Sequence, residues 1–313
     1  MVSKIPVIVV FAPTASGKTA LMHDLFSCKG SPFFLKGEII SADSMQVYKY
    51  MDIGTAKPTA DFCKKIPHHL INLITPDVQF SVAEFLDEVD KDCELINSKG
   101  KIPVVCGGTG FYIRSFLYGL PKTPESDSSV RDMLKKRIKD EGNEKLYQEL
   151  ASIDPLSAAV IHKNDEYRIC RALEVYYTTG KTRSSYKCEQ RFREKYNPIF
   201  IVLEPDRKIL FERINKRVDK MISEGLKEEV LSLKKMGYTK DMPGMKAIGY
   251  QEWFCDDEDT LIIEKIKHNS CKYAKKQYTY IRNIPENLVH PFSGEKCDID
   301  EIIKIIQKEL KIF

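Results

Sequence analysis

Short apolar runs alternate with amphipathic stretches along much of the chain, and this alternation is typical of an α/β fold with a parallel sheet. Four of these runs predict buried strands, at residues 5–10, 38–43, 102–106 and 199–203. A helix is expected directly after the first strand. Ser81-Val82-Ala83-Glu84 has the form of a capping box, so a second helix is expected to extend to Ser98 and to end at Gly100.

The pattern changes at about residue 121. Residues 121–197 contain no convincing buried strand and carry amphipathic stretches at 130–141, 144–151 and 166–179. We therefore predict an all-helical insertion there, with residues 1–120 and 198–313 forming the core. Beyond the insertion, long helices are expected at 207–236 and 258–282. On the first of these, Arg213, Arg217 and Lys220 recur at helical spacing, and solvation helped by the nearby Glu228 and Glu229 explains this basic face.

The turn after the first strand carries the clearest chemistry. A buried strand, a tight loop ending in Gly17-Lys18-Thr19 and a helix are the context of a phosphate-binding loop, so a P-loop NTPase-like core is predicted. Backbone amides and the helix dipole would hold an anion, Lys18 would reach terminal phosphate oxygens, and Thr19 would hold Mg²⁺. The common pattern begins with glycine; Ala12 suits that place if its φ is negative. The predicted anion-binding residues are Ala12, Pro13, Thr14, Ala15, Ser16, Gly17, Lys18 and Thr19.

Two further strand ends are expected to face the same crevice, because ligands of open α/β sheets bind at the carboxyl ends of strands. Asp43 closes the second strand and begins a long polar loop that reaches Pro58. Gly107-Gly108-Thr109 follows the third strand. Its glycines would allow close approach of the backbone to a ligand, and Thr109 could donate to a phosphate oxygen.

Other features of the sequence limit the choice of function. Adjacent His68 and His69 would point to opposite faces of an extended segment, which favours a structural role over a shared metal. The net charge of +4 permits an RNA partner without requiring one. Nine cysteines without a C-x-x-C motif, no membrane-spanning run and no signal peptide indicate a cytoplasmic protein. The basic helix at 265–282, with interleaved tyrosines, fits RNA contact and a solvated face equally well.

A phosphate cradle beside a carboxylate suits two reactions. In one, pyrophosphate leaves as an amine or alcohol attacks, and the carboxylate accepts the proton of the nucleophile. In the other, a kinase transfers a phosphoryl group. The residues alone leave both reactions open.

The chain resembles the tRNA dimethylallyltransferase family, in its bacterial type, over nearly its whole length. The matching stretches are residues 13–19, Ile40-Ser41-Ala42-Asp43-Ser44, Met51-Asp52-Ile53-Gly54-Thr55-Ala56-Lys57-Pro58, Pro67-His68-His69-Leu70, Gly107-Gly108-Thr109, Arg168 with Arg171-Ala172-Leu173-Glu174-Val175, Arg217-Val218-Asp219 and Ala247-Ile248-Gly249-Tyr250. The resemblance implies transfer of a dimethylallyl group from its diphosphate to N6 of the adenosine 3′ of the tRNA anticodon, with Mg²⁺. It also implies that the phosphate loop holds a prenyl diphosphate, although the motif alone would suggest ATP.

The resemblance further implies roles for particular residues. Asp43 would be the general base, Thr109 and Arg217 would donate to the leaving pyrophosphate, and Thr19 would hold Mg²⁺. The helical insertion would clamp the anticodon stem of a monomeric enzyme. The residues implied in tRNA binding are Asp43, Ser44, Met45, Gln46, Thr109, Arg131, Tyr167, Arg168, Ile169, Cys170 and Arg171.

Three other functions remain to be distinguished. An isopentenyltransferase that acts on free adenine nucleotides would share the cradle and Asp43 but would need no helical clamp. A P-loop small-molecule kinase would consume ATP. An RNA-binding protein without catalytic activity would keep its function when Asp43 is lost.

Overall fold

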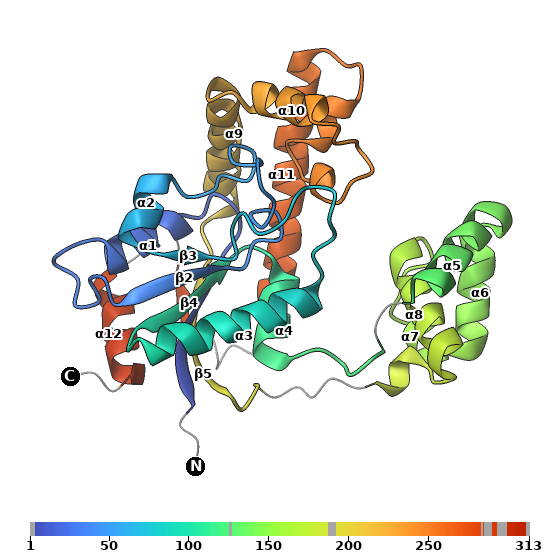
Figure 1. Ribbon diagram of the computed structural model, residues 1–313, viewed down its shortest axis with the longest axis horizontal. Coiled ribbons are helices and arrows are strands. Elements are labelled where there is room, and N and C mark those ends of the chain that lie inside the picture. Colours follow the sequence, from blue (N-terminus) through green and yellow to red (C-terminus); the bar gives the residue numbers. More distant parts are fainter. Residues whose placement is uncertain are drawn as a thin grey trace. The chain divides into compact units, whose positions relative to one another are not determined.

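The computed structural model describes residues 4–124, 127–186, 192–282, 284, 290–292 and 299–310. The chain divides into two compact units, drawn in Figure 1. The first comprises Met1–Leu117 with Phe192–Phe313, and the second comprises Tyr118–Arg191. The sequence prediction had divided the chain at residues 121 and 197.

The first unit is built on a six-stranded sheet of order β3-β2-β4-β1-β5-β6, in which every neighbouring pair is parallel. The predicted α/β class with a parallel sheet is therefore confirmed. The central strands are buried because helices cover both faces of the sheet, which explains their continuous apolar runs. The strands are β1 (Ile5–Phe11), β2 (Gly37–Ser41), β3 (His68–His69), β4 (Ile102–Gly107), β5 (Tyr196–Leu203) and β6 (His290–Phe292).

The order of the strands places a crevice at the carboxyl end of β1. The chain leaves β1 towards β2 on one side, returns through β4, and later adds β5 on the other side of β1. Such a reversal opens a crevice between neighbouring loops, where ligands of this fold class bind. The phosphate loop follows β1, Asp43 follows β2, and Gly108 follows β4, so all three lie at this edge of the sheet.

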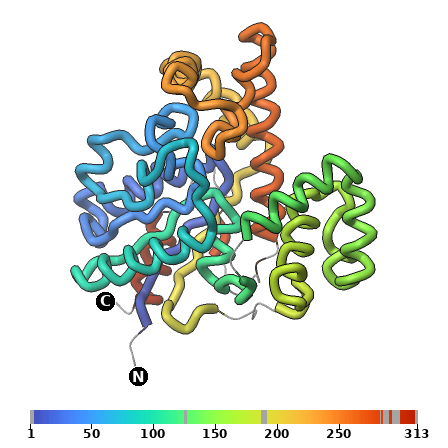
Figure 2. Tube along the Cα trace, turned by 45° about the vertical axis from the view of Figure 1, so that its right-hand side comes forward, coloured from blue at the N-terminus to red at the C-terminus, as the bar shows by residue number. Residues whose placement is uncertain are grey.

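The helices of the first unit cover the sheet and extend beyond it. The C-terminal α12 packs against α1, and both contribute to the core beside the sheet (Figure 2). A second apolar cluster joins α9, α10 and α11 to the loop after Asp43. The helices are α1 (Lys18–Phe26), α2 (Ala60–Lys65), α3 (Val82–Ser98), α4 (Gly110–Tyr118), α9 (Arg207–Ser223), α10 (Leu226–Lys235), α11 (Asp259–Arg282) and α12 (Ile299–Leu310).

Two sequence predictions about helices have opposite outcomes. The capping box is confirmed, because Ser81 Oγ accepts from the Glu84 amide and Glu84 accepts from the Ser81 amide before α3. The single helix predicted at 207–236 is wrong. It is divided into α9 and α10 at Gly225, whose φ of 99° is left-handed and ends a helical path.

The second unit is entirely helical in its described residues. Its core is formed by Leu134, Leu146, Leu150, Ile169, Leu173 and their neighbours. The carboxylate of Glu174 is buried there and accepts the amide of Asp127, while the guanidinium groups of Arg131 and Arg171 pair with it at 3.4 and 3.0 Å. The helices are α5 (Ser128–Glu141), α6 (Asn143–Ile153), α7 (Pro155–Ala158) and α8 (Glu166–Thr179).

The histidine pair on β3 has the predicted structural role. The His69 ring bonds to Glu38 through Nε2 at 2.8 Å and lies 3.2 Å from Asp92 through Nδ1, whereas Nδ1 of His68 contacts the Ile66 carbonyl. Hydrogen bonds to Asp92 and Glu38 raise the pKa of His69, and burial lowers the pKa of His68. The two rings therefore have separate partners.

Stability should depend on pH through His69. Because its pKa is raised on folding, its contribution is full below the ordinary histidine pKa and is lost as pH rises through the folded value. We expect His69→Gln to lower the free energy of unfolding by about 1–2 kcal/mol more at about pH 6 than at about pH 9. Urea unfolding of both proteins at each pH measures this difference. An equal loss at both pH values would exclude a charged His69 in the folded state.

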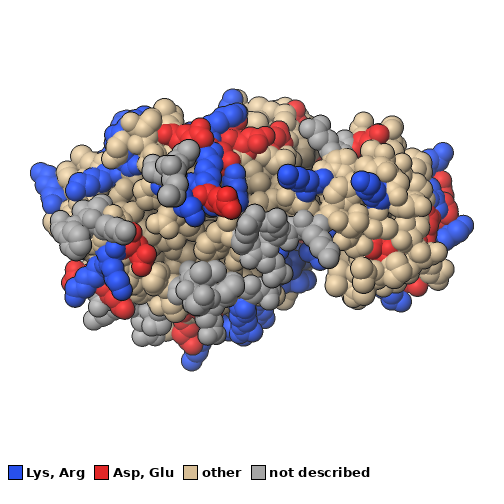
Figure 3. Space-filling view, turned by 90° about the horizontal axis from the view of Figure 1, so that it is seen from below, with Lys and Arg blue, Asp and Glu red and all other residues tan. Residues whose placement is uncertain are grey.

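Charge is spread rather than concentrated on the face drawn in Figure 3, where basic and acidic side chains are interspersed. Among the described helices, none is long and apolar enough to cross a bilayer.

Candidate active site

The loop between β1 and α1 has the backbone of an anion cradle. Ala15 and Gly17 both have positive φ, at 60° and 92°, so that the chain turns tightly into the first turn of α1. Ser16 donates its hydroxyl to the Pro13 carbonyl, which fixes the turn. Ala12 is buried and is not one of the residues with positive φ, as an alanine in that place requires.

Two cationic side chains, Lys18 and Arg217, lie near Asp43, which follows β2. The Lys18 ammonium donates to the carbonyls of Ala12 and Pro13, at 2.9 and 2.7 Å, which uses two of its three donors. Burial lowers the pKa of Lys18 to about 8, with a further lowering from Arg217. Burial also lowers the pKa of Arg217, and the charge of Asp43 opposes that shift. No hydrogen bond or ion pair holds the Arg217 guanidinium within the described part of the chain. A bound anion would stabilise the charged forms of both buried side chains.

Asp43 is held by its own loop. Its Oδ1 accepts from the Met45 amide at 2.9 Å, which fixes the carboxylate at the rim of the crevice. Thr109 Oγ1 accepts from the Ser44 amide at 3.0 Å and lies 3.3 Å from the Ser44 hydroxyl. Thr109 therefore braces the turn that carries Asp43, and the neighbouring Gly108 lines the cavity.

Gly107 and Gly108 have close protein neighbours as well, and the predicted close approach of their backbone to a ligand stays a prediction. A Cβ at Gly107 would lie 2.1 Å from the Ala42 carbonyl oxygen, and one at Gly108 would lie 2.4 Å from the amide nitrogen of Gln277. Both glycines thus allow close packing of protein against protein. At Gly107 the neighbour is backbone, so a side chain there would force the ends of β2 and β4 apart.

These groups surround a cavity of about 340 Å³ in the first unit. Its polar end holds Lys18, Thr19, Asp43 and Arg217, and Met45 and Gln46 contribute from the loop after Asp43. Apolar side chains from α9 and α11 form another part of the wall, among them Ile214, Val218, Met221 and Ile266. A charged anion site beside an apolar wall can hold a ligand that is ionic at one end and hydrocarbon at the other.

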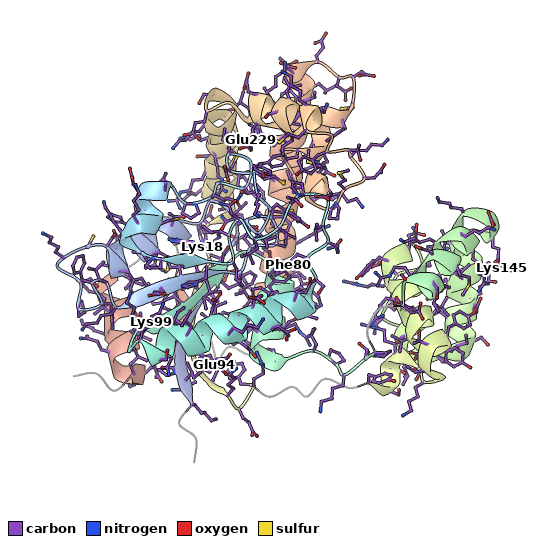
Figure 4. The ribbon with its side chains drawn as sticks, in the orientation of Figure 1. Lys18, Phe80, Glu94, Lys99, Lys145 and Glu229 are labelled. Atoms are coloured by element: carbon purple, nitrogen blue, oxygen red, sulfur yellow. The ribbon has the colours of Figure 1, made fainter. Side chains whose placement is uncertain are left out.

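Glu229 on α10 holds the loop from which Gly54 lines the cavity; Figure 4 labels Glu229 and Lys18. Its carboxylate accepts from the amides of Asp52, Ile53 and Gly54 at 2.9–3.3 Å and from the Tyr250 hydroxyl at 2.6 Å. Tyr250 in turn accepts from the Gly54 amide. The carboxylate of Glu229 therefore holds three successive backbone amides.

Removal of this carboxylate should disorder the loop. Glu229→Ala would leave three backbone amides without their acceptor. We expect the kcat/KM of the reaction at this cavity to fall by roughly 10- to 100-fold, mainly through a higher KM. Glu228→Ala on the same turn is the matched control and should leave kcat/KM near that of the wild type. Steady-state kinetics of the two variants make the comparison; equal kinetics would show that Glu229 does not position the loop.

Sequence reasoning missed two residues of α11 that face the crevice. Gln277 is buried; it accepts from the Thr14 amide at 3.0 Å and donates to the Gly108 carbonyl at 2.7 Å, so that one side chain joins the phosphate loop to the loop after β4. Tyr273 lies one turn earlier on α11 and also lines the cavity. Their spacing of four residues is the signal that places them on one helical face.

The residues predicted to bind tRNA lie in both units. Asp43, Ser44, Met45 and Gln46 line the cavity of the first unit. In the second unit, Tyr167 has an exposed fraction of 73%, and the Arg168 side chain has an exposed fraction of 59%. Both residues are therefore accessible to a large partner. Arg131 and Arg171 share the buried Glu174, while Ile169 and Cys170 fill the core.

Comparison with known proteins identifies the group to which this architecture belongs. The model of the IPP transferase family matches residues 46–284. The chain belongs to this family. It is 44% identical over 286 residues to the tRNA dimethylallyltransferase of Thermoanaerobacter sp. (strain X514), with 89% of each chain covered.

Solved structures of related enzymes have the same fold. A tRNA isopentenylpyrophosphate transferase from Staphylococcus epidermidis superposes with a TM-score of 0.67 at 38% identity, covering 98% of this chain and 99% of that one. A eukaryotic dimethylallyltransferase acting on tRNA gives a TM-score of 0.81 at 27% identity, covering 99% and 80%. These matches cover 98–99% of this chain, and its expected P-loop class is confirmed.

Proposed function

We propose that this IPP transferase is a tRNA dimethylallyltransferase, which moves a dimethylallyl group from its diphosphate to N6 of the adenosine 3′ of the anticodon. The observation that carries the proposal is the cavity in which Lys18 and Arg217 face Asp43 beside an apolar wall. The two cations suit a diphosphate, the wall suits a prenyl chain, and the carboxylate suits a nucleophile that must lose a proton.

Asp43 acts on the attacking amine. The lone pair of N6 is delocalised into the adenine ring, so the amine needs help to become a nucleophile. As the bond from N6 to C1 of the prenyl group forms and the bond from C1 to the diphosphate oxygen breaks, the proton of N6 passes to the Asp43 carboxylate. The Met45 amide holds that carboxylate at the rim, which orients its second oxygen for the transfer.

The phosphate loop and Arg217 receive the departing pyrophosphate. Negative charge grows on the bridging oxygen as the bond to C1 breaks, and donors already aimed at that position stabilise it. Lys18 and the amides at the start of α1 hold one side of the diphosphate, and Arg217 closes the other. Thr109 acts through Ser44 in this account, as a brace for the loop of Asp43.

The residues present fit a magnesium ion. Thr19 stands in the first turn of α1 and lines the cavity, where its hydroxyl offers a hard oxygen donor of the kind that Mg²⁺ prefers. Thr19 would hold Mg²⁺, which would supply neutralisation of the charge that develops on the leaving pyrophosphate.

The RNA would be held by both units of a monomeric enzyme. The target base must leave the stack of the anticodon loop to reach Asp43, as in other enzymes that modify bases. In the helical unit, the exposed Tyr167 and Arg168 suit contact with RNA. Arg131 and Arg171 would contribute to RNA binding indirectly, because their ion pairs with Glu174 stabilise the helices of this unit. A free nucleotide would need no such unit.

A transfer assay tests the proposal. Radiolabelled dimethylallyl diphosphate, Mg²⁺ and ATP are incubated with the enzyme and either an anticodon stem-loop that has adenosine 3′ of the anticodon or AMP. Label is expected in the stem-loop alone. Label in AMP alone would assign the protein to free nucleotides, and consumption of ATP without transfer in either tube would assign it to the kinases.

A further inference from the structure

Three metal-binding side chains meet at the far end of α1, away from the cavity. His23 and Asp24 belong to its last turn, and Cys28 follows two residues after the helix ends. Their donor atoms lie close together: His23 Nδ1 is 3.4 Å from Asp24 Oδ1, and Cys28 Sγ is 3.7 Å from His23 Nδ1 and 3.9 Å from Asp24 Oδ1. In the described residues this is the only group of three such donors within ligand distance.

The triangle of donors has the dimensions of one face of a zinc tetrahedron. Zinc binds imidazole nitrogen and carboxylate oxygen at about 2.0–2.2 Å and thiolate at about 2.3 Å, which puts neighbouring donors roughly 3.4–3.6 Å apart. The observed separations exceed these values by at most about 0.3 Å, which small side-chain rotations remove. We propose that His23, Asp24 and Cys28 form a site for a borderline-soft divalent ion of the Zn²⁺ class.

The surroundings support a cation at this place. Unpaired carbonyls give the C-terminal end of a helix a partial negative charge, so a positive ion is favoured beside the last turn of α1. The His23 ring packs against the Phe62 ring of α2, with centroids 6.1 Å apart, which limits its orientations. The turn after the helix is closed by the Ser31 amide on the Cys28 carbonyl, which limits the position of the thiol.

The donor set distinguishes this site from the proposed magnesium position. A thiolate and an imidazole select zinc-class ions, whereas Mg²⁺ takes oxygen ligands. When the ion binds, the Cys28 thiol loses its proton to solvent as the metal–sulfur bond forms, so one proton is released for each thiolate bound. Three protein ligands leave a fourth position for water or a small ligand. His23 and Asp24 are about half exposed, so the site is open to solvent.

The test uses the reduced, metal-free full-length protein with Mg²⁺ in excess. Co²⁺ replaces Zn²⁺ as the spectroscopic probe, because cobalt bound to a thiolate gives a charge-transfer band in the near ultraviolet. Wild type is expected to show this band with one equivalent of Co²⁺ and to lose it when Zn²⁺ is added. Competition with a chromogenic chelator then gives the zinc affinity, and circular dichroism confirms that each variant is folded.

Variants assign the ligands. We expect Cys28→Ser to abolish the cobalt band, and His23→Gln and Asp24→Asn each to weaken zinc binding by more than roughly 10-fold. Cys255→Ser is the matched control, since that exposed thiol also lies beside a carboxylate, Asp257, and should leave both readouts unchanged. An unchanged band in Cys28→Ser, or its loss in Cys255→Ser, would overturn the proposal and leave the three groups as a hydrogen-bonded cluster.

Discussion

Asp43→Asn should reduce the rate of prenyl transfer by roughly 10²- to 10⁴-fold, the range that a positioned general base contributes. The substitution is nearly isosteric, and the amide oxygen of asparagine can still accept from the Met45 amide, so the loop keeps its shape. Only the capacity to accept the proton of N6 is lost. Single-turnover transfer to an anticodon stem-loop measures the chemical step, and filter binding measures the affinity for RNA, which should change by less than about threefold.

The control is another carboxylate of the same loop. Asp52 is exposed and pairs with Lys57, so Asp52→Asn changes the charge of the loop by the same amount without touching the cavity. Transfer by this variant should stay close to that of the wild type. A near-normal rate in Asp43→Asn would remove Asp43 from the role of general base, and an equal loss in both variants would attribute the effect to loop charge.

Lys18→Ala should lower kcat/KM for dimethylallyl diphosphate by about 10²- to 10³-fold, because a buried cation aimed at the leaving group is lost. Its carbonyl partners, those of Ala12 and Pro13, would also lose their donor, so part of the effect comes from a looser loop. Affinity for the stem-loop alone should be unchanged. The kinetics are measured with varied diphosphate at saturating RNA.

Two further variants separate the effect of the Lys18 charge from the effect of a looser phosphate loop. Lys18→Met keeps most of the side-chain volume without the ammonium, and it should lose as much activity as Lys18→Ala if the charge is what matters. Lys29→Ala removes an exposed lysine beyond the end of α1 and should have no effect. Unchanged affinity for the diphosphate in both Lys18 variants would exclude Lys18 from the cradle.

Local patterns in the sequence predicted the framework well. For the first strand, the Gly-Lys-Thr turn and the helix after it, the apolar pattern and the turn residues predict the same structure, so their positions follow from short stretches of sequence. Ser81 and Glu84 likewise exchange hydrogen bonds between side chain and backbone within four residues. Asp43 could be placed at the crevice because the carboxyl ends of parallel strands share one edge of the sheet.

Long-range partners could not be predicted in the same way. Glu229 stands on a helix whose charged residues fit a solvated face, and the three amides that it binds lie about 175 residues earlier in the chain. Gln277 contacts Thr14 across 263 residues, and its role depends on how α11 crosses the loops. The break at Gly225 is local, but a single glycine between helical patterns fits either a C-cap or a tolerated interior residue.

N6 of one adenosine is the proposed nucleophile, and a single comparison tests this role. Labelled dimethylallyl diphosphate is offered to two anticodon stem-loops that differ only at the position 3′ of the anticodon, where one carries adenosine and the other inosine. Inosine has oxygen in place of N6. Label is expected in the adenosine stem-loop and none in the inosine stem-loop. Equal label in both would contradict this role.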